Sequence, residues 1–204
     1  MTSERMRRAY DLIAARFAAA NATMPADLAR AAARLAELVA PGARVLDLGC
    51  GAGRDLAWLE RLGLSPVGVD LSGGMLAEAR QRTRAPLLQM DMRDLGFADG
   101  QFEAIWCCAS LLHLSRSEAP AALGEMRRVL APRGILFLAV QEGAGEGWER
   151  APYGEVDRFF ARYSQAEVAG LLAQSGFSVL EWGASRSEGR AWLRAIARRV
   201  GCAP

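Results

Sequence analysis

Residues 45–55 read VLDLGCGAGRD, and this stretch decides the fold. A short apolar run containing Asp47 leads into a turn with glycines at positions 49, 51 and 53, and a segment with helical periodicity follows. Glycine adopts backbone conformations closed to other residues and lets a backbone approach a ligand closely. A buried strand that enters a helix through such a turn is typical of a parallel α/β sheet with a ligand above the turn.

Strands and helices alternate along the rest of the chain. Apolar runs predict strands, and amphipathic segments between them predict helices. The expected strands are 44–48, 66–69, 86–90, 102–107, 135–140, 177–182 and 190–197, and the expected helices are 4–20, 25–40, 54–62, 72–82, 118–130 and 164–175. Residues 141–160 are rich in glycine and charge and lack a clear period, so a loop or lid is expected there. The alternation predicts an α/β fold with a mostly parallel sheet and helices on both faces.

Composition restricts the function further. The chain has 204 residues and fits one domain, in which residues 1–41 form a helical cap on a core of residues 42–204. A net charge of +2 gives no indication of nucleic-acid binding, and the absence of lysine excludes Schiff-base chemistry. The four cysteines form no C-x-x-C pair and His113 is the only histidine, so no metal site is expected. No signal peptide or membrane-spanning run is evident, which predicts a cytoplasmic protein.

Acidic residues stand at the ends of the first three expected strands. They are Asp47, Asp70 and Asp91. Asp47 would repel a pyrophosphate but suits a cationic group, Asp70 can accept both hydroxyls of a ribose, and Asp91 can accept from the amine of a base. The third glycine also comes one residue earlier than in G-x-G-x-x-G, which argues against an NAD-dependent oxidoreductase. The pattern therefore indicates a ligand with a ribose, an amine-bearing base and a cationic part.

The chain resembles the class I S-adenosylmethionine-dependent methyltransferases, in particular bacterial proteins with a methyltransferase-11/25-type domain. The resemblance rests on VLDLGCGAGRD, VGVDLSGGMLAEAR, LLQMDMRDLGF, FEAIWCCASLLHL and EMRRVLAPRGILFLAV, in this order. It implies a Rossmann-like sheet of seven strands whose last strand is antiparallel and inserted beside the fifth. It also implies S-adenosyl-L-methionine as the cofactor and S-adenosyl-L-homocysteine as the product.

The resemblance assigns roles to individual residues. Positions matching the glycine turn run under the methionine part of the cofactor, Asp47 helps to hold its amino group, and Asp70 binds its ribose. The complete set of expected cofactor-binding residues is Asp47, Gly49, Cys50, Gly51, Gly53, Asp70, Leu71, Met75, Asp91, Met92 and Cys107. The N-terminal AYDLIAARF resembles a helix that caps the site and usually ends in tyrosine, where this chain has Phe17.

Several residues are candidates for the acceptor side of the site. His113 follows the fourth strand and is a candidate general base or substrate contact; a local hydrogen bond that shapes the loop is the alternative. Glu142 is a second acid or base candidate, against a solvated carboxylate, and Tyr10 is a substrate contact or a core residue. Four residues after the expected lid are candidates for a substrate entrance, with a surface patch packed on the sheet as the alternative: Arg158, Phe159, Phe160 and Tyr163. The arginines near the C-terminus, which include Arg190, Arg194, Arg198 and Arg199, are expected on solvated faces.

We expect transfer of a methyl group to an O or N nucleophile of a small molecule. The short chain without an inserted recognition domain favours a small acceptor over tRNA or protein, which remain alternatives, as does a module that binds the cofactor without turnover. The expected partners are a small-molecule acceptor, with no membrane and no nucleic acid, and the chain is expected to be a monomer or a homodimer.

Overall fold

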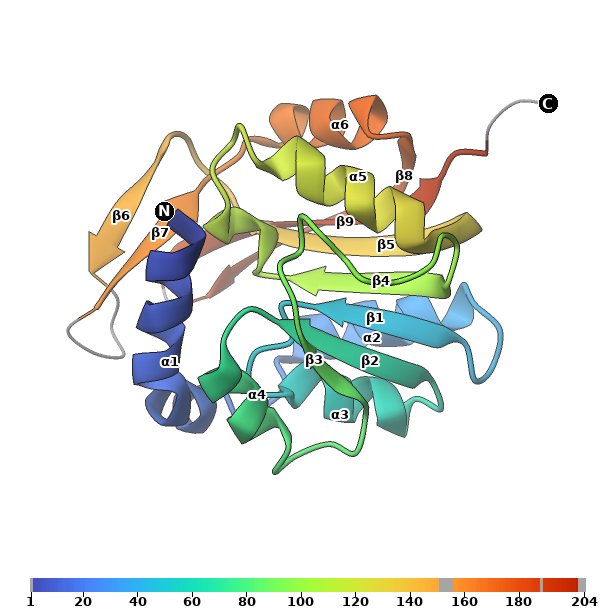
Figure 1. Cartoon of the computed structure of the whole chain (residues 1–204). Helices are drawn as coiled ribbons and strands as arrows, with labels where there is room; N and C mark the ends of the chain where they lie inside the picture. The colour runs from blue at the N-terminus through green and yellow to red at the C-terminus, as the bar shows by residue number, and fades with distance from the viewer. Residues whose placement is uncertain (1, 151–155, 188, 202–204) are drawn as a thin grey trace.

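The computed structural model describes residues 2–150, 156–187 and 189–201, and its centre is a seven-stranded sheet of order β3-β2-β1-β4-β5-β9-β8 (Figure 1). The strands are β1 (Arg44–Leu48), β2 (Ser65–Asp70), β3 (Leu87–Gln89), β4 (Phe102–Cys108), β5 (Leu130–Gln141), β8 (Phe177–Ser187) and β9 (Arg190–Arg199). β1 to β5 pair in parallel, whereas β9 runs antiparallel to both β5 and β8. The predicted sheet, including its inserted antiparallel strand, is confirmed.

Helices cover both faces of this sheet and one of its ends. α5 (Ala119–Val129) and α6 (Gln165–Gln174) lie on one face, and α2 (Ala26–Glu37) and α3 (Arg54–Arg61) lie on the other (Figure 1). α1 (Thr2–Ala20) crosses the carboxyl ends of the parallel strands, beside the short α4 (Gly73–Ala79). No helix in the described part of the chain has both the length and the apolar character needed to cross a bilayer.

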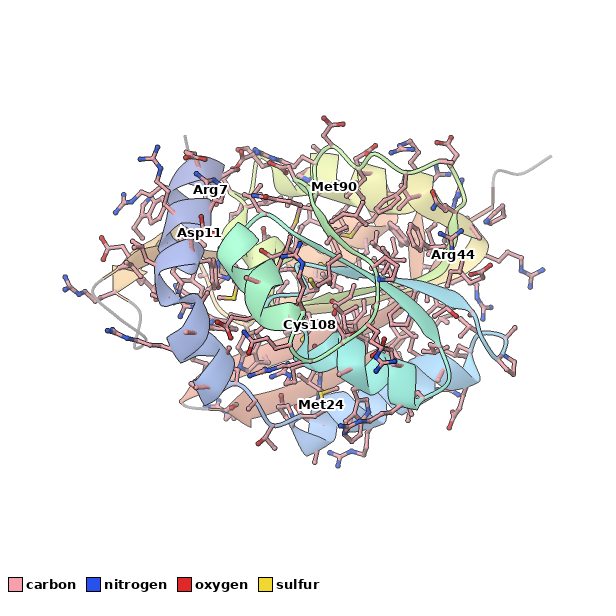
Figure 2. The ribbon with its side chains drawn as sticks, turned by 60° about the horizontal axis from the view of Figure 1, so that its bottom comes forward. Arg7, Asp11, Met24, Arg44, Met90 and Cys108 are labelled. Carbon is pink, nitrogen blue, oxygen red and sulfur yellow. The ribbon has the colours of Figure 1, made fainter. Side chains whose placement is uncertain are left out.

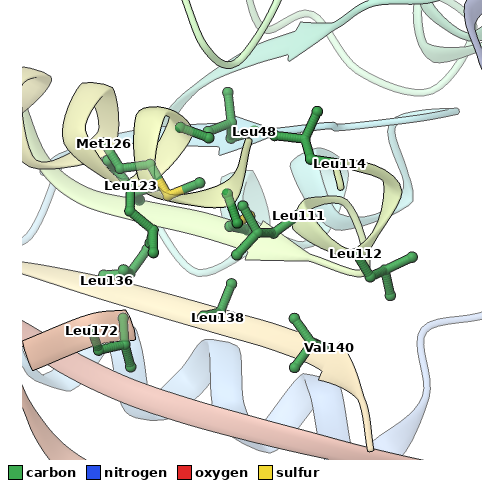
Figure 3. Packing of buried hydrophobic residues seen from close by; sticks show 14 of the residues in the cluster. Leu48, Leu111, Leu112, Leu114, Leu123, Met126, Leu136, Leu138, Val140 and Leu172 are labelled. Carbon is green, nitrogen blue, oxygen red and sulfur yellow. The ribbon is translucent and has the colours of Figure 1, made fainter. Parts of the chain in front are cut away.

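The core has two layers because successive strand residues point to opposite faces of the sheet. On β4, Ile105 belongs to the layer under α5, while Trp106 belongs to the layer under α2. Trp106 stacks on Phe137 of β5 with ring centroids 3.8 Å apart. Figure 3 shows the α5 layer, whose labelled residues are Leu48, Leu111, Leu112, Leu114, Leu123, Met126, Leu136, Leu138, Val140 and Leu172.

The expectation of a loop over residues 141–160 is wrong for much of this segment. β6 (Glu146–Arg150) pairs antiparallel with β7 (Asp157–Ala161), so that a small hairpin stands beside α1 (Figure 1). The consecutive residues Phe159 and Phe160 are both buried. The two-residue period of a half-exposed strand is therefore missing, which explains why the sequence pattern did not indicate a strand. Residues 151–155 of the expected lid, like Cys202, lie outside the described residues.

Other boundaries differ by a few residues. α4 ends at Ala79, earlier than the expected helix over 72–82, and β5 begins at Leu130, before the Pro-Arg-Gly sequence that was expected to precede it. The pairing of β4 with β5 shifts register between Phe102 and Ala104, so the extra residues of β5 fit as an irregularity in the ladder. The predicted capping box of α6 is confirmed: Ser164 and Glu167 each accept from the other's backbone N–H.

Asp11 fixes α1 to the start of α4. One of its carboxylate oxygens accepts hydrogen bonds from the Ser72 hydroxyl at 2.6 Å and from the Gly74 amide at 3.0 Å, and the other pairs with Arg7 at 2.8 Å. Arg7 and Asp11 are labelled on α1 in Figure 2, beside α4. A Cβ on Gly74 would lie 3.0 Å from Cα of Asp11, so a larger residue there would push α1 and α4 apart by a few tenths of an ångström. α1 is therefore held over the strand ends by charge-assisted hydrogen bonds as well as by apolar contacts.

Replacing Asp11 with alanine should detach this end of α1. The Ser72 hydroxyl and the Gly74 amide would lose a charged acceptor, so we expect the free energy of unfolding in Asp11→Ala to fall by about 1–3 kcal/mol, measured by urea denaturation. Glu4→Ala, on the same helix, removes only exposed pairs with Arg7 and Arg8 and should cost less. Equal losses in the two variants would contradict the anchoring role of Asp11.

Candidate functional site

A cavity of about 640 Å³ opens at the carboxyl ends of the parallel strands, beneath α1. Most of the residues selected from the sequence line it. They are Tyr10, Phe17, Asp47, Gly49, Cys50, Gly51, Asp70, Leu71, Met75, Asp91, Met92 and His113. Gly53, Cys107 and Glu142 are not among the lining residues. The volume is in the range of small-molecule and cofactor sites.

The glycine turn joins the ends of three strands. The amides of Gly49 and Cys50 both donate to the Val69 carbonyl of β2, at 2.8 and 2.9 Å. Ser110, after β4, donates through its hydroxyl to the Leu48 carbonyl at 2.6 Å. Gly49 has a φ of 78°, and a Cβ there would lie 2.3 Å from Cβ of Ser110. A side chain at position 49 would thus separate β1 from the loop after β4.

Asp70 closes the turn from the side of β2. Its carboxylate accepts from the Gly51 amide at 2.9 Å and from the Ser72 amide at 2.8 Å. Burial raises the pKa of Asp70, and these backbone hydrogen bonds oppose the rise. Because each carboxylate oxygen can accept more than one hydrogen bond, Asp70 can still accept from hydroxyl groups inside the cavity.

Asp47 is the most unusual group of the site. It is 2% exposed, and its Oδ2 has no hydrogen-bond partner among the described residues. Burial raises the pKa of Asp47 well above its ordinary value, and the negative charge of Asp55 adds to the rise. A buried acceptor without a donor is costly, so a cationic donor in the cavity would stabilise this carboxylate.

Asp91 reaches the cavity with its carboxylate already paired. It accepts from Nε and Nη2 of Arg93 at 2.9 and 2.6 Å, and these contacts lower the pKa of Asp91. It therefore stays ionised, and an amine of a ligand would be an additional donor. Leu71, Met75 and Met92 supply apolar lining.

An ion pair that the sequence pattern did not single out fixes Arg54 at the cavity wall. Asp55 accepts from Nε1 of Trp106 at 2.8 Å and from Nε of Arg54 at 2.6 Å. Arg54 and Asp55 both line the cavity. The sequence did contain a signal for this pair: two charged residues of opposite sign follow the glycine turn directly, on a helix that packs against the sheet. The positive charge of Arg54 partly opposes the rise in the pKa of Asp47.

Tyr10 and His113 form a hydrogen-bonded pair that joins α1 to the loop after β4. The Tyr10 hydroxyl lies 2.6 Å from Nε2 of His113, and Nδ1 of His113 lies 2.7 Å from the Phe159 carbonyl. A carbonyl only accepts, so Nδ1 carries the proton and Nε2 accepts from Tyr10. Nη1 of Arg158 donates to the Tyr10 oxygen at 3.0 Å.

These contacts bear on the role of His113. Burial lowers the pKa of His113 to about 3, and the nearby charge of Arg158 contributes to the shift. The ring is therefore neutral near pH 7, and both of its nitrogens are engaged. This arrangement favours His113 as a residue that positions Tyr10, while its action as a general base stays a prediction.

Three predicted residues lie away from the cavity. Glu142 is exposed, and the buried Gln141 lines the cavity instead. Cys107 is buried with its sulfur 3.1 Å from Oγ of Ser110, and the neighbouring Cys108 lines the cavity. Gly53 supports the turn from behind, since a Cβ there would lie 3.0 Å from Ala79.

The expectation that the C-terminal arginines lie on solvated faces is wrong for two of them. Arg190 and Arg194 line the cavity together with Trp192. These three residues alternate along β9 and share one face of it, and the β8–β9 hairpin extends past β5 to reach the site. The alternation was visible in the sequence, but the length of the hairpin was not. Of the four candidates for a substrate entrance, Arg158 and Phe160 also line the cavity, whereas Phe159 and Tyr163 are buried in the core and do not.

Comparison with known proteins gives a consistent result. A family model described as a methyltransferase domain matches residues 45–134. A putative methyltransferase of Encephalitozoon cuniculi is 32% identical over 158 residues, which cover 68% of this chain and 72% of that protein. The methyltransferase GfsG of Streptomyces halstedii is 38% identical over 109 residues, which cover 50% of this chain and 38% of GfsG. The chain matches only 38–42% of the length of the first three curated relatives.

A solved structure agrees over nearly the whole chain. The 1,6-didemethyltoxoflavin-N1-methyltransferase of Burkholderia thailandensis, with bound 1,6-didemethyltoxoflavin and S-adenosylhomocysteine, superposes with a TM-score of 0.75 at 20% identity. The match covers 95% of this chain and 88% of that one. At this level of identity the likeness establishes the shared fold.

The single histidine allows a direct test of the Tyr10–His113 pair. In imidazole-selective NMR, His113 should give one set of signals with the proton on Nδ1 and no titration between about pH 5 and 8. As the pH falls from 6.5 to about 3, the unfolded chain binds this proton and the folded chain does not, so His113 lowers the free energy of unfolding in that window. The His113 signals of Tyr10→Phe serve as the comparison, because this variant removes only the hydroxyl that contacts Nε2 of His113. A midpoint near 6.5 in the unchanged protein would contradict the burial of this ring.

Proposed function

Because the chain belongs to the class I S-adenosylmethionine-dependent methyltransferases, we propose that it transfers a methyl group from S-adenosyl-L-methionine to an oxygen or nitrogen of a small molecule. The observation that carries this proposal is the pair of carboxylates, Asp47 and Asp70, on either side of the glycine turn in one cavity. Asp47 lacks a donor, and Asp70 is fixed by two backbone amides with acceptor capacity left.

The cavity fits this cofactor residue by residue. In our proposal Asp70 accepts from the ribose hydroxyls, and the unpartnered oxygen of Asp47 accepts from the amino group of the methionine part. The backbone from Gly49 to Gly51 approaches the methionine part, because no side chain intervenes there. Leu71, Met75 and Met92 enclose the adenine ring, and Asp91 accepts from its amine.

Methyl transfer requires little from the protein beyond positioning of the acceptor. The cofactor supplies a methyl group on a sulfonium centre, where the leaving group is already activated. Holding an acceptor in line with that methyl group can contribute about 7–11 kcal/mol in favourable cases. In our proposal α1 excludes water from above, and the neutral ring of His113 fixes the Tyr10 hydroxyl at the cavity wall.

The small-molecule acceptor is supported by the shape of the site. α1 lies over the strand ends and the β6–β7 hairpin stands beside it, so the acceptor must enter a covered cavity. The structural neighbour from Burkholderia thailandensis has 1,6-didemethyltoxoflavin bound in the same fold.

Calorimetry with Asp70→Ala tests the cofactor. The unchanged protein should bind S-adenosylmethionine and S-adenosylhomocysteine saturably and should not bind NAD. Loss of the acceptor for two hydroxyls should weaken both adenosyl ligands about 100-fold or more. Asp99→Asn is the matched control, because this carboxylate is 80% exposed and pairs with Arg128 outside the cavity. NAD binding with no adenosyl binding would contradict the proposal.

The raised pKa of Asp47 leads to a separate prediction about proton release on ligand binding. Since burial raises its pKa, Asp47 holds a proton to higher pH when no cation is bound, and a cationic amino group favours its ionised form. Binding of S-adenosylhomocysteine should therefore release a proton, and affinity should rise with pH until the pKa of the ligand-free carboxyl is passed. Calorimetry in buffers of different ionisation enthalpy measures the release. Asp47→Asn should abolish it and weaken binding about 10- to 100-fold, whereas unchanged proton release in this variant would exclude Asp47 as its source.

A further inference from the structure

We propose that the methyl acceptor is an anion, a small molecule with a carboxylate or phosphate group that binds Arg190 and Arg158 beside Phe160. This inference rests on the proposed function and specifies its substrate class. It concerns the half of the cavity that the cofactor-binding residues do not use.

Acidic and basic side chains are concentrated on different parts of the cavity, although Arg54, paired with Asp55, stands among the acids, and Asp27, paired with Arg194, stands at the basic side. The acids Asp47, Asp70 and Asp91 stand at the ends of β1 and β2 and after β3. The opposite wall, formed by β7, β8 and β9, contributes the guanidinium groups Arg158, Arg186, Arg190 and Arg194. The acidic side suits a cationic cofactor, so the basic side is left to act on the other reactant.

The arginines of this wall differ in how far their charge is neutralised. Arg194 pairs with Asp27 at 2.7 Å and also donates to the Ala184 carbonyl. Arg186 and Arg190 form no ion pair with any residue that the structure describes. Arg190 is nevertheless partly buried, at a cavity wall where its charge is incompletely hydrated. An anion entering the cavity would find this guanidinium available for a bidentate contact.

Arg158 brings a second guanidinium to the same place. Its guanidinium carbon lies 5.2 Å from the ring centroid of Phe160, and that of Arg190 lies 5.7 Å from the same centroid. The residue is 3% exposed, and the hydrogen bond from Nη1 to the Tyr10 hydroxyl holds it in place. Two like charges on one ring repel each other, and an anion between or beside them would relieve that repulsion.

The same residues indicate the size and body of the acceptor. Phe160, Trp192 and Tyr10 line the cavity around the arginines, so an apolar or aromatic body is accommodated next to the anionic group. Arg158 is 3% exposed and lies on β7, and a buried guanidinium suits a small anion that enters the cavity better than the backbone of a nucleic acid. The observations therefore favour a small anion over an RNA.

The connection to Tyr10 places the anion site next to the reacting position. Arg158 donates to the oxygen that also contacts His113, so a group bound by Arg158 lies beside the Tyr10 hydroxyl. An acceptor whose carboxylate or phosphate contacts Arg158 and Arg190 would present its remaining atoms to the space under α1.

The test uses a set of probes with one shape and different charge. Benzoate, phenyl phosphate, benzamide and benzylamine are titrated into the 204-residue protein, with and without saturating S-adenosylhomocysteine, and binding is followed by NMR and calorimetry. We expect benzoate or phenyl phosphate to bind and benzamide and benzylamine to bind at least about tenfold more weakly. The stronger of the two anions identifies whether a carboxylate or a phosphate is preferred.

Variants on one strand give the matched comparison. Arg190→Gln should weaken the preferred anion about 10- to 100-fold, Arg190→Lys should restore part of the binding, and Arg198→Gln, on the same strand but outside the cavity, should leave it unchanged. S-adenosylhomocysteine affinity, measured separately, should be the same in all three variants and so reports that they fold.

The outcomes separate this inference from the proposed function. Benzamide binding as tightly as benzoate, or an equal loss in Arg190→Gln and Arg198→Gln, would overturn the anion site. Displacement of the anions by a short RNA with an affinity that falls steeply with salt would replace the small acceptor with a nucleic acid. Failure of S-adenosylhomocysteine to bind would refute the proposed cofactor, while the anion titrations without it would still decide the role of Arg190.

Discussion

The contact between Gly49 and Ser110 sets the geometry on which the rest of the site depends. With no side chain at position 49, the turn after β1 lies against the loop after β4, and the Ser110 hydroxyl donates to the last carbonyl of β1. Ser110 thereby also fixes the start of the loop that carries His113. Because parallel strands end at the same edge of the sheet, this one approach brings the acids of β1 and β2 and the loop after β4 to a common cavity.

The cavity that results is held in an electrostatically unsatisfied state. Asp47 has an oxygen without a donor, and Arg190 has no carboxylate partner in the described part of the chain. Each would cost free energy if its charge were buried alone, and the protein limits that cost in different ways. Burial raises the pKa of Asp47, which lets this group become neutral, whereas an arginine stays charged and keeps partial contact with solvent. A cationic cofactor and an anionic acceptor would satisfy the two groups together.

Sequence reasoning predicted one half of this site far better than the other. The residues of the cofactor half follow strand ends and a glycine turn, so local pattern fixes their positions, as Asp47 and Asp70 illustrate. The acceptor half depends on how far two hairpins extend. Phe159 and Phe160 are both buried, which conceals β7, and Arg190 reaches the cavity because β8 and β9 are longer than their apolar segments. Glu142 follows β5 but turns outward, since the side chains of consecutive residues on a strand point to opposite faces and Gln141 takes the inward one.

Substitutions can change the acceptor half of the site without changing the cofactor half. The family match covers residues 45–134, which contain the acids of the cofactor half, while Tyr10, Arg158 and Arg190 lie outside it. The two halves are joined where α1 is fixed to α4 through Asp11 and to β7 through the hydrogen bond between Arg158 and Tyr10, and where His113 contacts Tyr10 and the Phe159 carbonyl. A substitution on β7 or β9 can therefore alter the charge offered to an acceptor while Gly49, Asp47 and Asp70 keep their contacts. The hydrogen bonds of α1 are then what keeps any new acceptor in register with the cofactor, because this helix contacts both walls of the cavity.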